Sequence, residues 1–260
     1  MSEHLFIKGL EVEEDAFGNN IHDCYQTGNH YAGYEIEERD DGRFTMYGDS
    51  NAYFEPLEDW TQTQQQLAHQ IKGKVLDVGC GGGKHALFFQ ENGCEVYAMD
   101  NSSLAVETCK LRGIKNTIVC DVGHFEKLRK ELVFDQVVFW GNNLGLMQNE
   151  RFFAHFMQLL EAHTHAHSVI FMESMSPYGE GFLDEDTRDY VANNLRQGRM
   201  GGQMRVKVRY KKFATPWSDY LFASHEELEK MLGPTAWRIE TLHQDPTSHQ
   251  YIAQIVRKTP

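Results

Sequence analysis

The residues with the clearest chemical potential are three alternating glycines, Gly79, Gly81 and Gly83, which follow the apolar run 75–78 almost directly. A short apolar run that stops at glycines predicts a buried strand, a tight turn and then a helix, here beginning near Lys84. Glycines let the backbone of such a turn approach a ligand closely because they carry no Cβ. The first amide groups of the following helix have no partner within the helix and can bind a polar ligand.

An acidic residue at the end of the next apolar run completes the pattern. Asp100 lies 21 residues after Gly79 and closes the apolar run 96–99. A carboxylate in this position can accept hydrogen bonds from both hydroxyls of a ribose. The glycines, Asp100 and the adjacent Asn101 therefore predict a site for a cofactor that contains a nucleoside.

The spacing of the glycines distinguishes between two kinds of nucleoside cofactor. Dinucleotide sites use G-x-G-x-x-G or G-x-G-x-x-A. Counting from Gly79 places Lys84 at the last position, and counting from Gly81 places Ala86 there but begins two residues too far from the strand. The pattern D-x-G-x-G-x-G fits from Asp77 to Gly83. Its aspartate would face a cationic amino-acid tail of the cofactor instead of a pyrophosphate.

This pattern resembles motif I of the class I S-adenosylmethionine-dependent methyltransferases, and the resemblance covers roughly residues 57–176 and 224–258. It implies S-adenosyl-L-methionine as the cofactor, bound by Asp77, the three glycines, Asp100 and Asn101. It further implies that Asp121 and Val122, after the third strand, contact the adenine. Asn142 and Asn143, after the fourth strand, would position the reacting groups near the methyl.

Alternating strand and helix patterns predict the fold. Apolar runs at 75–78, 96–99, 117–120, 135–140 and 168–172 are separated by helical patterns, which is typical of a parallel sheet. The runs 237–242 and 251–256 then predict a hairpin after a helix that begins at Ser224. The predicted fold class is α/β, a Rossmann-like, seven-stranded, mostly parallel sheet with a C-terminal antiparallel strand.

Two segments lie outside the family pattern. Residues 1–56 are predicted to be an N-terminal extension, and about 177–223 an insertion within a methyltransferase domain at 57–260. We expect both segments to shape the pocket for the methyl acceptor, with Tyr25, Tyr31 and Tyr53 among its apolar walls.

Several other patterns have a plain structural interpretation. Arg205, Lys207, Arg209 and Lys211 alternate with apolar residues, so period two places them on one strand face, which we interpret as a solvated face in preference to an anion site. The series His163, His165 and His167 is interpreted as a solvated turn, because a metal site needs a full ligand set that the neighbouring residues do not supply. Glu173 and Tyr178 follow the fifth strand, either in a capped loop or facing the acceptor.

Composition excludes some classes of partner. The net charge of −13 disfavours nucleic acid, because binding phosphates needs clustered Lys and Arg. No apolar run approaches the ~20 residues of a membrane span. Five scattered cysteines without a C-x-x-C pair indicate reduced thiols in a cytoplasm. Nothing in the sequence specifies an oligomeric state.

The sequence thus predicts an S-adenosylmethionine-dependent methyltransferase that acts on a small molecule by in-line methyl transfer. The turn at 141–143 supports a small acceptor, because amino-methylating enzymes of nucleic acids usually have Pro-Pro there. Two alternatives stay open. One is an NAD(P)-dependent oxidoreductase that uses Gly81, Gly83 and Ala86, and the other is a non-catalytic module that binds S-adenosylmethionine.

Overall fold

The computed structural model describes residues 2–29, 31, 33–179 and 184–259. The chain forms two compact units, each assembled from separate segments. The first unit comprises Met1–Trp60, Lys72–Leu128 and Arg205–Ser218, and the second comprises Thr61–Ile71, Arg129–Met204 and Asp219–Pro260. None of the helices in the described part of the chain is long and apolar enough to cross a membrane.

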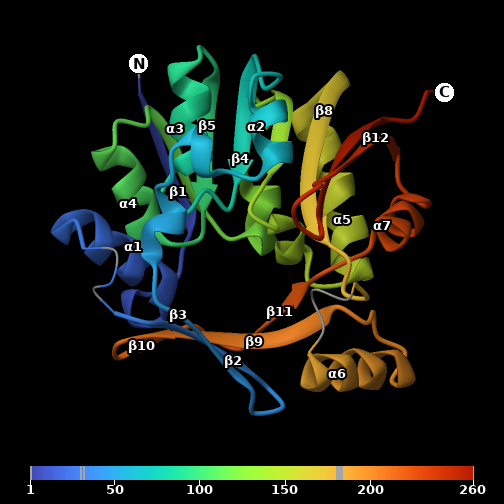
Figure 1. The fold of residues 1–260 in the computed structure, drawn as a ribbon. Helices are drawn as coiled ribbons and strands as arrows, with labels where there is room; N and C mark the ends of the chain where they lie inside the picture. Colours follow the sequence, from blue (N-terminus) through green and yellow to red (C-terminus); the bar gives the residue numbers. More distant parts are fainter. Residues whose placement is uncertain (1, 30, 32, 180–183, 260) are drawn as a thin grey trace. The chain divides into compact units, whose positions relative to one another are not determined.

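The first unit contains a four-stranded parallel layer (Figure 1). Its strands stand in the order β1 (Glu3–Lys8), β6 (Asn116–Cys120), β5 (Glu95–Asp100) and β4 (Lys74–Val78). Neighbours pair in parallel throughout. The inner strands are buried along almost their whole length and mostly apolar, as is usual for a parallel sheet with both faces covered.

Helices connect these strands. Helix α3 (Lys84–Glu91) joins β4 to β5, and α4 (Ser103–Leu111) joins β5 to β6. The N-terminal helix α1 (Ala16–Thr27) packs against α4. The carboxyl ends of β4, β5 and β6 therefore lie next to one another in register, which positions the residues that follow each strand.

The second unit contains β7 (Phe134–Phe139), β8 (Thr164–Met175), β13 (Gln250–Arg257) and β12 (Trp237–Gln244), in that order. β7 and β8 are parallel, whereas β13 is antiparallel to both β8 and β12. The helices of the second unit are α2 (Gln62–Ala68), α5 (Glu150–Leu160), α6 (Glu185–Arg196) and α7 (His225–Leu232).

The eight strands of this mostly parallel α/β fold, with their antiparallel C-terminal members, confirm the predicted fold class. The predicted number of seven is wrong by one, because β1 joins the edge beside β6. As an edge strand, β1 alternates between half-buried and exposed residues, so it lacks the mostly apolar run that marked the inner strands. The predicted terminal hairpin corresponds to β12 and β13.

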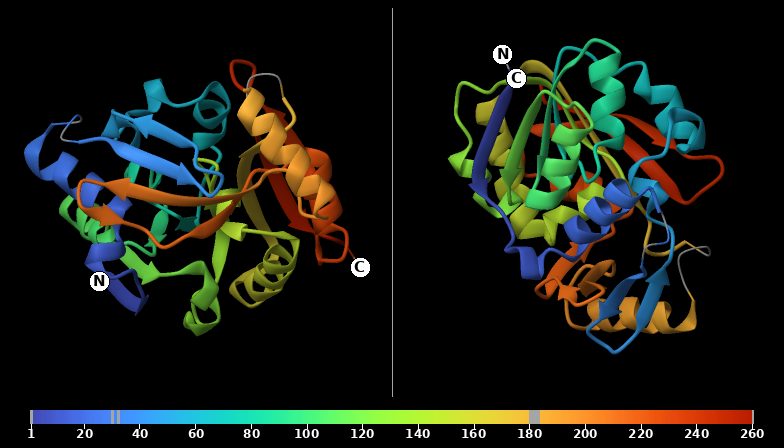
Figure 2. Two further views of the ribbon diagram at one scale, coloured as in Figure 1. Left: turned by 90° about the horizontal axis from the view of Figure 1, so that it is seen from below. Right: turned by 90° about the vertical axis from the view of Figure 1, so that its left-hand side faces the viewer.

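A second, antiparallel sheet lies in the first unit. Its strands follow the order β10 (Phe213–Ala214), β9 (Gln203–Tyr210), β2 (Glu35–Arg39) and β3 (Phe44–Tyr47), and Figure 2 shows the blue β2–β3 hairpin beside the orange β9. The N-terminal segment and the predicted insertion thus meet through backbone pairing of β2 with β9. The boundary at residue 56 stays a prediction.

The alternation predicted for the basic strand is correct for three of its four cations. In β9, Val206, Val208 and Tyr210 are buried, and the cationic residues point to the opposite face. Arg209 Nη2 lies 2.7 Å from Glu38 Oε2 on that face. Lys211 is the exception, because β9 ends at Tyr210 and Lys211 turns the chain with a φ of +52°.

The interpretation of the histidine series as a solvated turn is correct in that His165 and His167 are exposed, but it is wrong about the secondary structure and about His163. β8 begins at Thr164, so His165 and His167 belong to a strand. His163 is buried, with Nδ1 2.8 Å from the carbonyl oxygen of Leu132. His165 Nε2 lies 2.8 Å from Asp135 Oδ1.

Candidate functional site

The turn after β4 adopts a backbone conformation that requires its glycines. Gly79, Gly81 and Gly83 have φ values of +74°, +52° and +79°, in the left-handed region that residues with a Cβ avoid. Gly83 is also the N-cap residue of α3, and a Cβ at this position would lie 2.5 Å from Ile114 Cδ1 and 2.9 Å from Cys109 Sγ. The turn is therefore fixed both by its own torsions and by close packing.

We expect Gly83→Ala to destabilise the protein more than Gly93→Ala does. Gly93 has a φ of +92° but open space around its Cα, so alanine there adds only the cost of the left-handed backbone, about 1–2 kcal/mol. At Gly83, the contacts with Ile114 and Cys109 add about 1–3 kcal/mol for overpacking. Urea unfolding of both variants measures the difference, and equal losses of stability would show that the turn relaxes around the new methyl.

Tyr53 and Phe54 cover the glycine turn, a contact that the glycine motif itself does not predict. Tyr53 ends the short 3₁₀ helix η2 (Ser50–Tyr53), and its Cδ1 would lie 3.3 Å from a Cβ on Gly81. A Cβ on Gly82 would lie 2.8 Å from the carbonyl oxygen of Tyr53 and 2.9 Å from Phe54 Cε1. The dipeptide Tyr53–Phe54 thus packs directly on the turn, so one tyrosine of the predicted apolar wall lies next to the motif.

Asp77 lies inside β4 with an unsatisfied carboxylate oxygen. Its side chain is only 1% exposed, and Oδ2 has no hydrogen-bond partner among the described residues. Burial, together with the negative charge of Asp100, raises the pKa of Asp77 to about 7. A hydrogen bond from the amide of Ala86 acts in the opposite direction, because it stabilises the carboxylate. A buried carboxylate oxygen without a donor is unfavourable and favours a cationic group that would approach it.

Asp100 connects the glycine turn to the start of α4. Its Oδ2 accepts a hydrogen bond of 2.9 Å from the amide of Gly81, and its Oδ1 accepts one of 2.9 Å from the amide of Ser102. Burial raises the pKa of Asp100 to about 6, although both amides favour the ionised form. Each oxygen keeps a second lone pair for further donors such as hydroxyls.

Asn101 and Asp121 join the ends of β5 and β6. Asn101 Nδ2 lies 3.4 Å from Asp121 Oδ2, and Asp121 Oδ1 accepts a 2.7 Å hydrogen bond from the amide of Gly123. Asp121 therefore caps the 3₁₀ helix η4 (Val122–Lys127), in which Val122 is the first residue. The structure brings these predicted residues to one edge of the first unit, together with Asp77, Asp100 and the glycines.

The two predicted asparagines lie in the second unit, at the end of β7. Asn142 has a φ of +62° and precedes the 3₁₀ helix η5 (Asn143–Met147), and its carbonyl oxygen accepts a 2.7 Å hydrogen bond from the hydroxyl of Tyr220. Its Oδ1 is shielded from solvent and has no partner among the described residues. The Tyr220 ring also occupies the space where a Cβ on Gly145 would stand.

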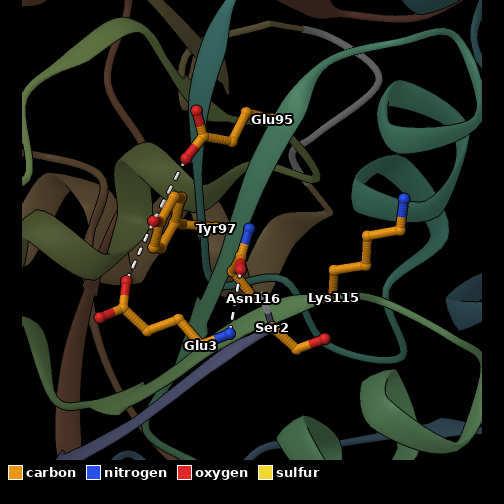
Figure 3. Close-up of a pocket in the computed structure, with 6 residues that line it drawn as sticks. All are labelled: Ser2, Glu3, Glu95, Tyr97, Lys115 and Asn116. Atoms are coloured by element: carbon orange, nitrogen blue, oxygen red, sulfur yellow. Dashed lines mark hydrogen bonds between the residues drawn. The ribbon is translucent and has the colours of Figure 1, made fainter.

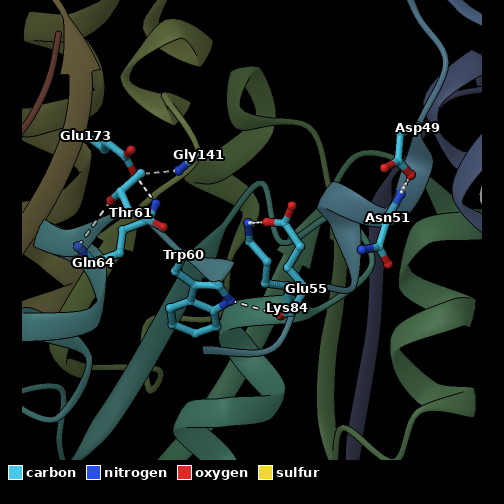
Figure 4. A network of polar contacts seen from close by, with 9 residues as sticks. All are labelled: Asp49, Asn51, Glu55, Trp60, Thr61, Gln64, Lys84, Gly141 and Glu173. Atoms are coloured by element: carbon cyan, nitrogen blue, oxygen red, sulfur yellow. Dashed lines mark hydrogen bonds and ion pairs between the residues drawn. The ribbon is translucent and has the colours of Figure 1, made fainter. Parts of the chain in front are cut away.

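Glu173 supports this turn from β8. It is 1% exposed, and its Oε2 accepts hydrogen bonds of 2.7 Å from the amide of Gly141 and from Gln64 Nε2 (Figure 4). The capped-loop interpretation of Glu173 is wrong, because β8 continues to Met175. Figure 4 also shows Lys84 paired with Glu55 in the first unit, at 3.1 Å.

A separate pocket lies at the opposite ends of the first unit's strands (Figure 3). Residues at the starts of β1, β5 and β6 line it: Ser2, Glu3, Glu95, Tyr97, Lys115 and Asn116. The hydroxyl of Tyr97 lies 3.0 Å from Glu3 Oε2 and 3.3 Å from Glu95 Oε1. Because open α/β sheets bind ligands at the carboxyl ends of their strands, this pocket is distinct from the glycine site.

Comparison with known proteins agrees with this geometry. Residues 75–163 match the family model described as a methyltransferase domain. An uncharacterized methyltransferase from Staphylococcus carnosus is 31% identical over 97 residues, which span 36% of this chain and 44% of that relative's length. The matched segment thus covers less than half of the curated relative.

Solved structures share the fold. An S-adenosylmethionine-dependent methyltransferase from Bacteroides fragilis, crystallised with S-adenosyl-L-homocysteine, has a TM-score of 0.81 at 23% identity, over 97% of this chain and 98% of the other. A second such enzyme, from Clostridium acetobutylicum, has a TM-score of 0.55 at 12% identity, over 79% and 93%. Residues 75–163 are thus similar to a methyltransferase domain, and the chain shares the fold of S-adenosylmethionine-dependent methyltransferases.

Proposed function

We propose that this protein transfers the methyl group of S-adenosyl-L-methionine to a small molecule by in-line displacement. The observation that carries the proposal is the buried, unsatisfied Oδ2 of Asp77 beside the glycine turn. The cofactor's amino-acid tail would supply the ammonium group that this oxygen lacks. A dinucleotide presents no such cation to this position.

The remaining predicted residues fit the other parts of the cofactor. Asp100 would accept hydrogen bonds from the ribose hydroxyls while it keeps Gly81 in place. Asp121 and Val122 would contact the adenine, with Asn101 holding the Asp121 carboxylate. These assignments are our proposal and rest on the positions of the residues at adjacent strand ends.

The chemistry asks little of the protein beyond alignment. When bound, the cofactor supplies a methyl group attached to a positively charged sulfonium sulfur. The rest of the cofactor is the leaving group, a neutral thioether. The chain's residues must hold the acceptor in line and exclude water. We propose that Asn142 and Asn143 contribute to this alignment, because the turn that carries them is fixed by Glu173 through Gly141 and by Tyr220.

The choice of a small molecule is supported by charge. The net charge of −13 opposes binding to nucleic acid. The basic face of β9 is partly neutralised, since Arg209 pairs with Glu38 and the Lys207 ammonium lies 4.8 Å from the centre of the Trp217 ring. We also propose a cytoplasmic location, which the five buried cysteines, none of them in a disulfide among the described residues, support.

Calorimetric titration with S-adenosylmethionine, S-adenosylhomocysteine and NAD tests the cofactor. We expect the first two to bind and NAD not to bind, and tight NAD binding would favour the oxidoreductase instead. Formation of S-adenosylhomocysteine with a panel of small amines, phenols, thiols and carboxylates tests turnover. Cofactor binding without turnover on any of them would favour the non-catalytic module.

Cofactor binding should release protons at slightly acidic pH. An ammonium group beside Asp77 favours its carboxylate form, so the pKa of Asp77 should fall from about 7 when the cofactor binds. Titrations at pH 6.5 in buffers of different ionisation enthalpy should report release of roughly three quarters of a proton. Asp77→Asn should abolish this release, and an unchanged value in that variant would assign the proton to another group.

A further inference from the structure

Glu35 is an anionic residue of the first unit that no cation of the described chain neutralises by an ion pair. It begins β2 and is half-buried. Its Oε2 accepts hydrogen bonds of 2.9 Å from Asn20 Nδ2 and of 3.1 Å from the hydroxyl of Tyr53, and both donors are neutral. Asn20 is fixed in turn by the hydroxyl of Ser50, which donates to Asn20 Oδ1 at 2.7 Å.

A second carboxylate makes the surroundings of Glu35 more negative. Glu37 lies two residues along β2 and therefore on the same face of the strand. Across the ladder, Glu35 stands opposite Tyr47 and Glu37 opposite Thr45. Burial is the main cause that raises the pKa of Glu35, and the charge of Glu37 adds to it. The charges of Arg39 and Arg43 act on Glu37. The property that favours a cationic ligand is therefore the set of neutral donors around the half-buried Glu35 carboxylate.

Tyr53 connects this carboxylate to the cofactor turn. Its ring packs on Gly81, where Cδ1 lies 3.3 Å from the position of a Cβ, while its hydroxyl donates to Glu35. One tyrosine side chain therefore spans from the glycine motif to Glu35. The carboxylate lies within the length of a small ligand from the turn that would hold the cofactor.

We propose that the methyl acceptor is an organic amine, and that Glu35, held by Asn20 and Tyr53, binds its nitrogen. This rests on the proposed methyl transfer. The amine arrives as an ammonium ion and gives one proton to Glu35, which passes it to water. The nitrogen lone pair then forms the N–C bond as the C–S bond breaks, and the electron pair of that bond stays on sulfur. The positive charge moves from sulfur to nitrogen, where the Glu35 carboxylate stabilises it.

Matched pairs of probes test this assignment. The protein is first saturated with S-adenosylhomocysteine, and benzylamine, benzyl alcohol, cyclohexylamine and cyclohexanol are then titrated into it. We expect each amine to bind at least roughly tenfold more tightly than the alcohol of the same shape, because a charged hydrogen bond replaces a neutral one. Glu35→Gln should remove this preference and leave binding of the alcohols unchanged.

Glu38→Gln is the matched control. Glu38 lies in the same strand but on the opposite face, paired with Arg209, so its substitution should leave the amine preference intact. If Glu35→Gln does not fold, Glu35→Asp keeps the charge but withdraws it by one methylene, and the preference should then fall without complete loss.

The outcomes separate this inference from the proposed function. Failure of S-adenosylhomocysteine to bind overturns the cofactor assignment itself. Three results overturn only the role of Glu35 while S-adenosylhomocysteine binds normally: no preference for the amines, a preference that survives in a folded Glu35→Gln variant, or a preference that is undiminished in Glu35→Asp.

Discussion

Asp77→Asn is expected to stabilise the cofactor-free protein at pH 8 and to weaken cofactor binding by at least roughly tenfold. The stabilisation follows from the raised pKa of Asp77, which is about 7 in the folded chain against an ordinary value of 3.8. Ionisation of this buried carboxyl group destabilises the folded state, whereas in the unfolded state the same group ionises in water without this penalty. The difference corresponds to an upper limit on the order of 4 kcal/mol.

The sign of the pH dependence follows directly. Between about pH 4 and pH 7 the unfolded chain has already lost the proton while folded Asp77 retains it. Stability from this group therefore falls as the pH rises through that window, and stays low above it. Asparagine does not ionise, so the advantage of Asp77→Asn should grow from pH 4 to pH 7.

Urea unfolding at pH 5 and pH 8, with calorimetry of S-adenosylmethionine binding, measures both effects. Asp59→Asn serves as the control, because Asp59 is exposed and its loss should change neither quantity appreciably. A stability profile of Asp77→Asn that runs parallel to the wild type would contradict the assignment of a buried ionisable group. Undiminished cofactor affinity would contradict the role of its free oxygen.

Asp100→Ala should also reduce cofactor affinity by at least roughly tenfold, for a different reason. The variant would lose the proposed acceptors for the ribose hydroxyls, at about 1.5–3 kcal/mol for each charge-assisted hydrogen bond. It also releases the amide of Gly81, which now donates to Asp100 Oδ2 at 2.9 Å, so the glycine turn is less well ordered before binding. Two losses at one side chain make this a large effect.

Two further variants separate these contributions. Asp100→Asn keeps one oxygen for the Gly81 amide, so its affinity should lie between those of the wild type and Asp100→Ala. Asp121→Ala removes a cap at the end of the neighbouring strand β6 and should weaken binding less, because Asp121 holds the amide of Gly123 and not the glycine turn. Normal affinity of a folded Asp100→Ala variant would show that the ribose lies elsewhere.

Features that depend on local order along the chain could be predicted from the sequence. Buried strands such as β4 and β5 are mostly apolar runs, and the turn after β4 needs glycines wherever the rest of the chain lies. The position of Asp100 could be predicted in the same way, because the carboxyl ends of neighbouring parallel strands lie at the same edge of the sheet. The cofactor class and the fold class could therefore be predicted.

The residues from distant segments that lie beside the glycine turn became apparent only from the packing of the folded chain. Strand β1 was missed because an edge strand has no continuous apolar pattern, and Lys211 was misplaced because a left-handed turn breaks the alternation. Tyr53 was predicted only as one of several apolar walls of the acceptor pocket, and Glu35 carries no local signal, since an acidic residue in a polar segment is usually on the surface. Their contacts join residues from different segments of the chain, such as Tyr53 with Gly81 and with Glu35. The periodicity and spacing of residues along the chain contain no information about such contacts.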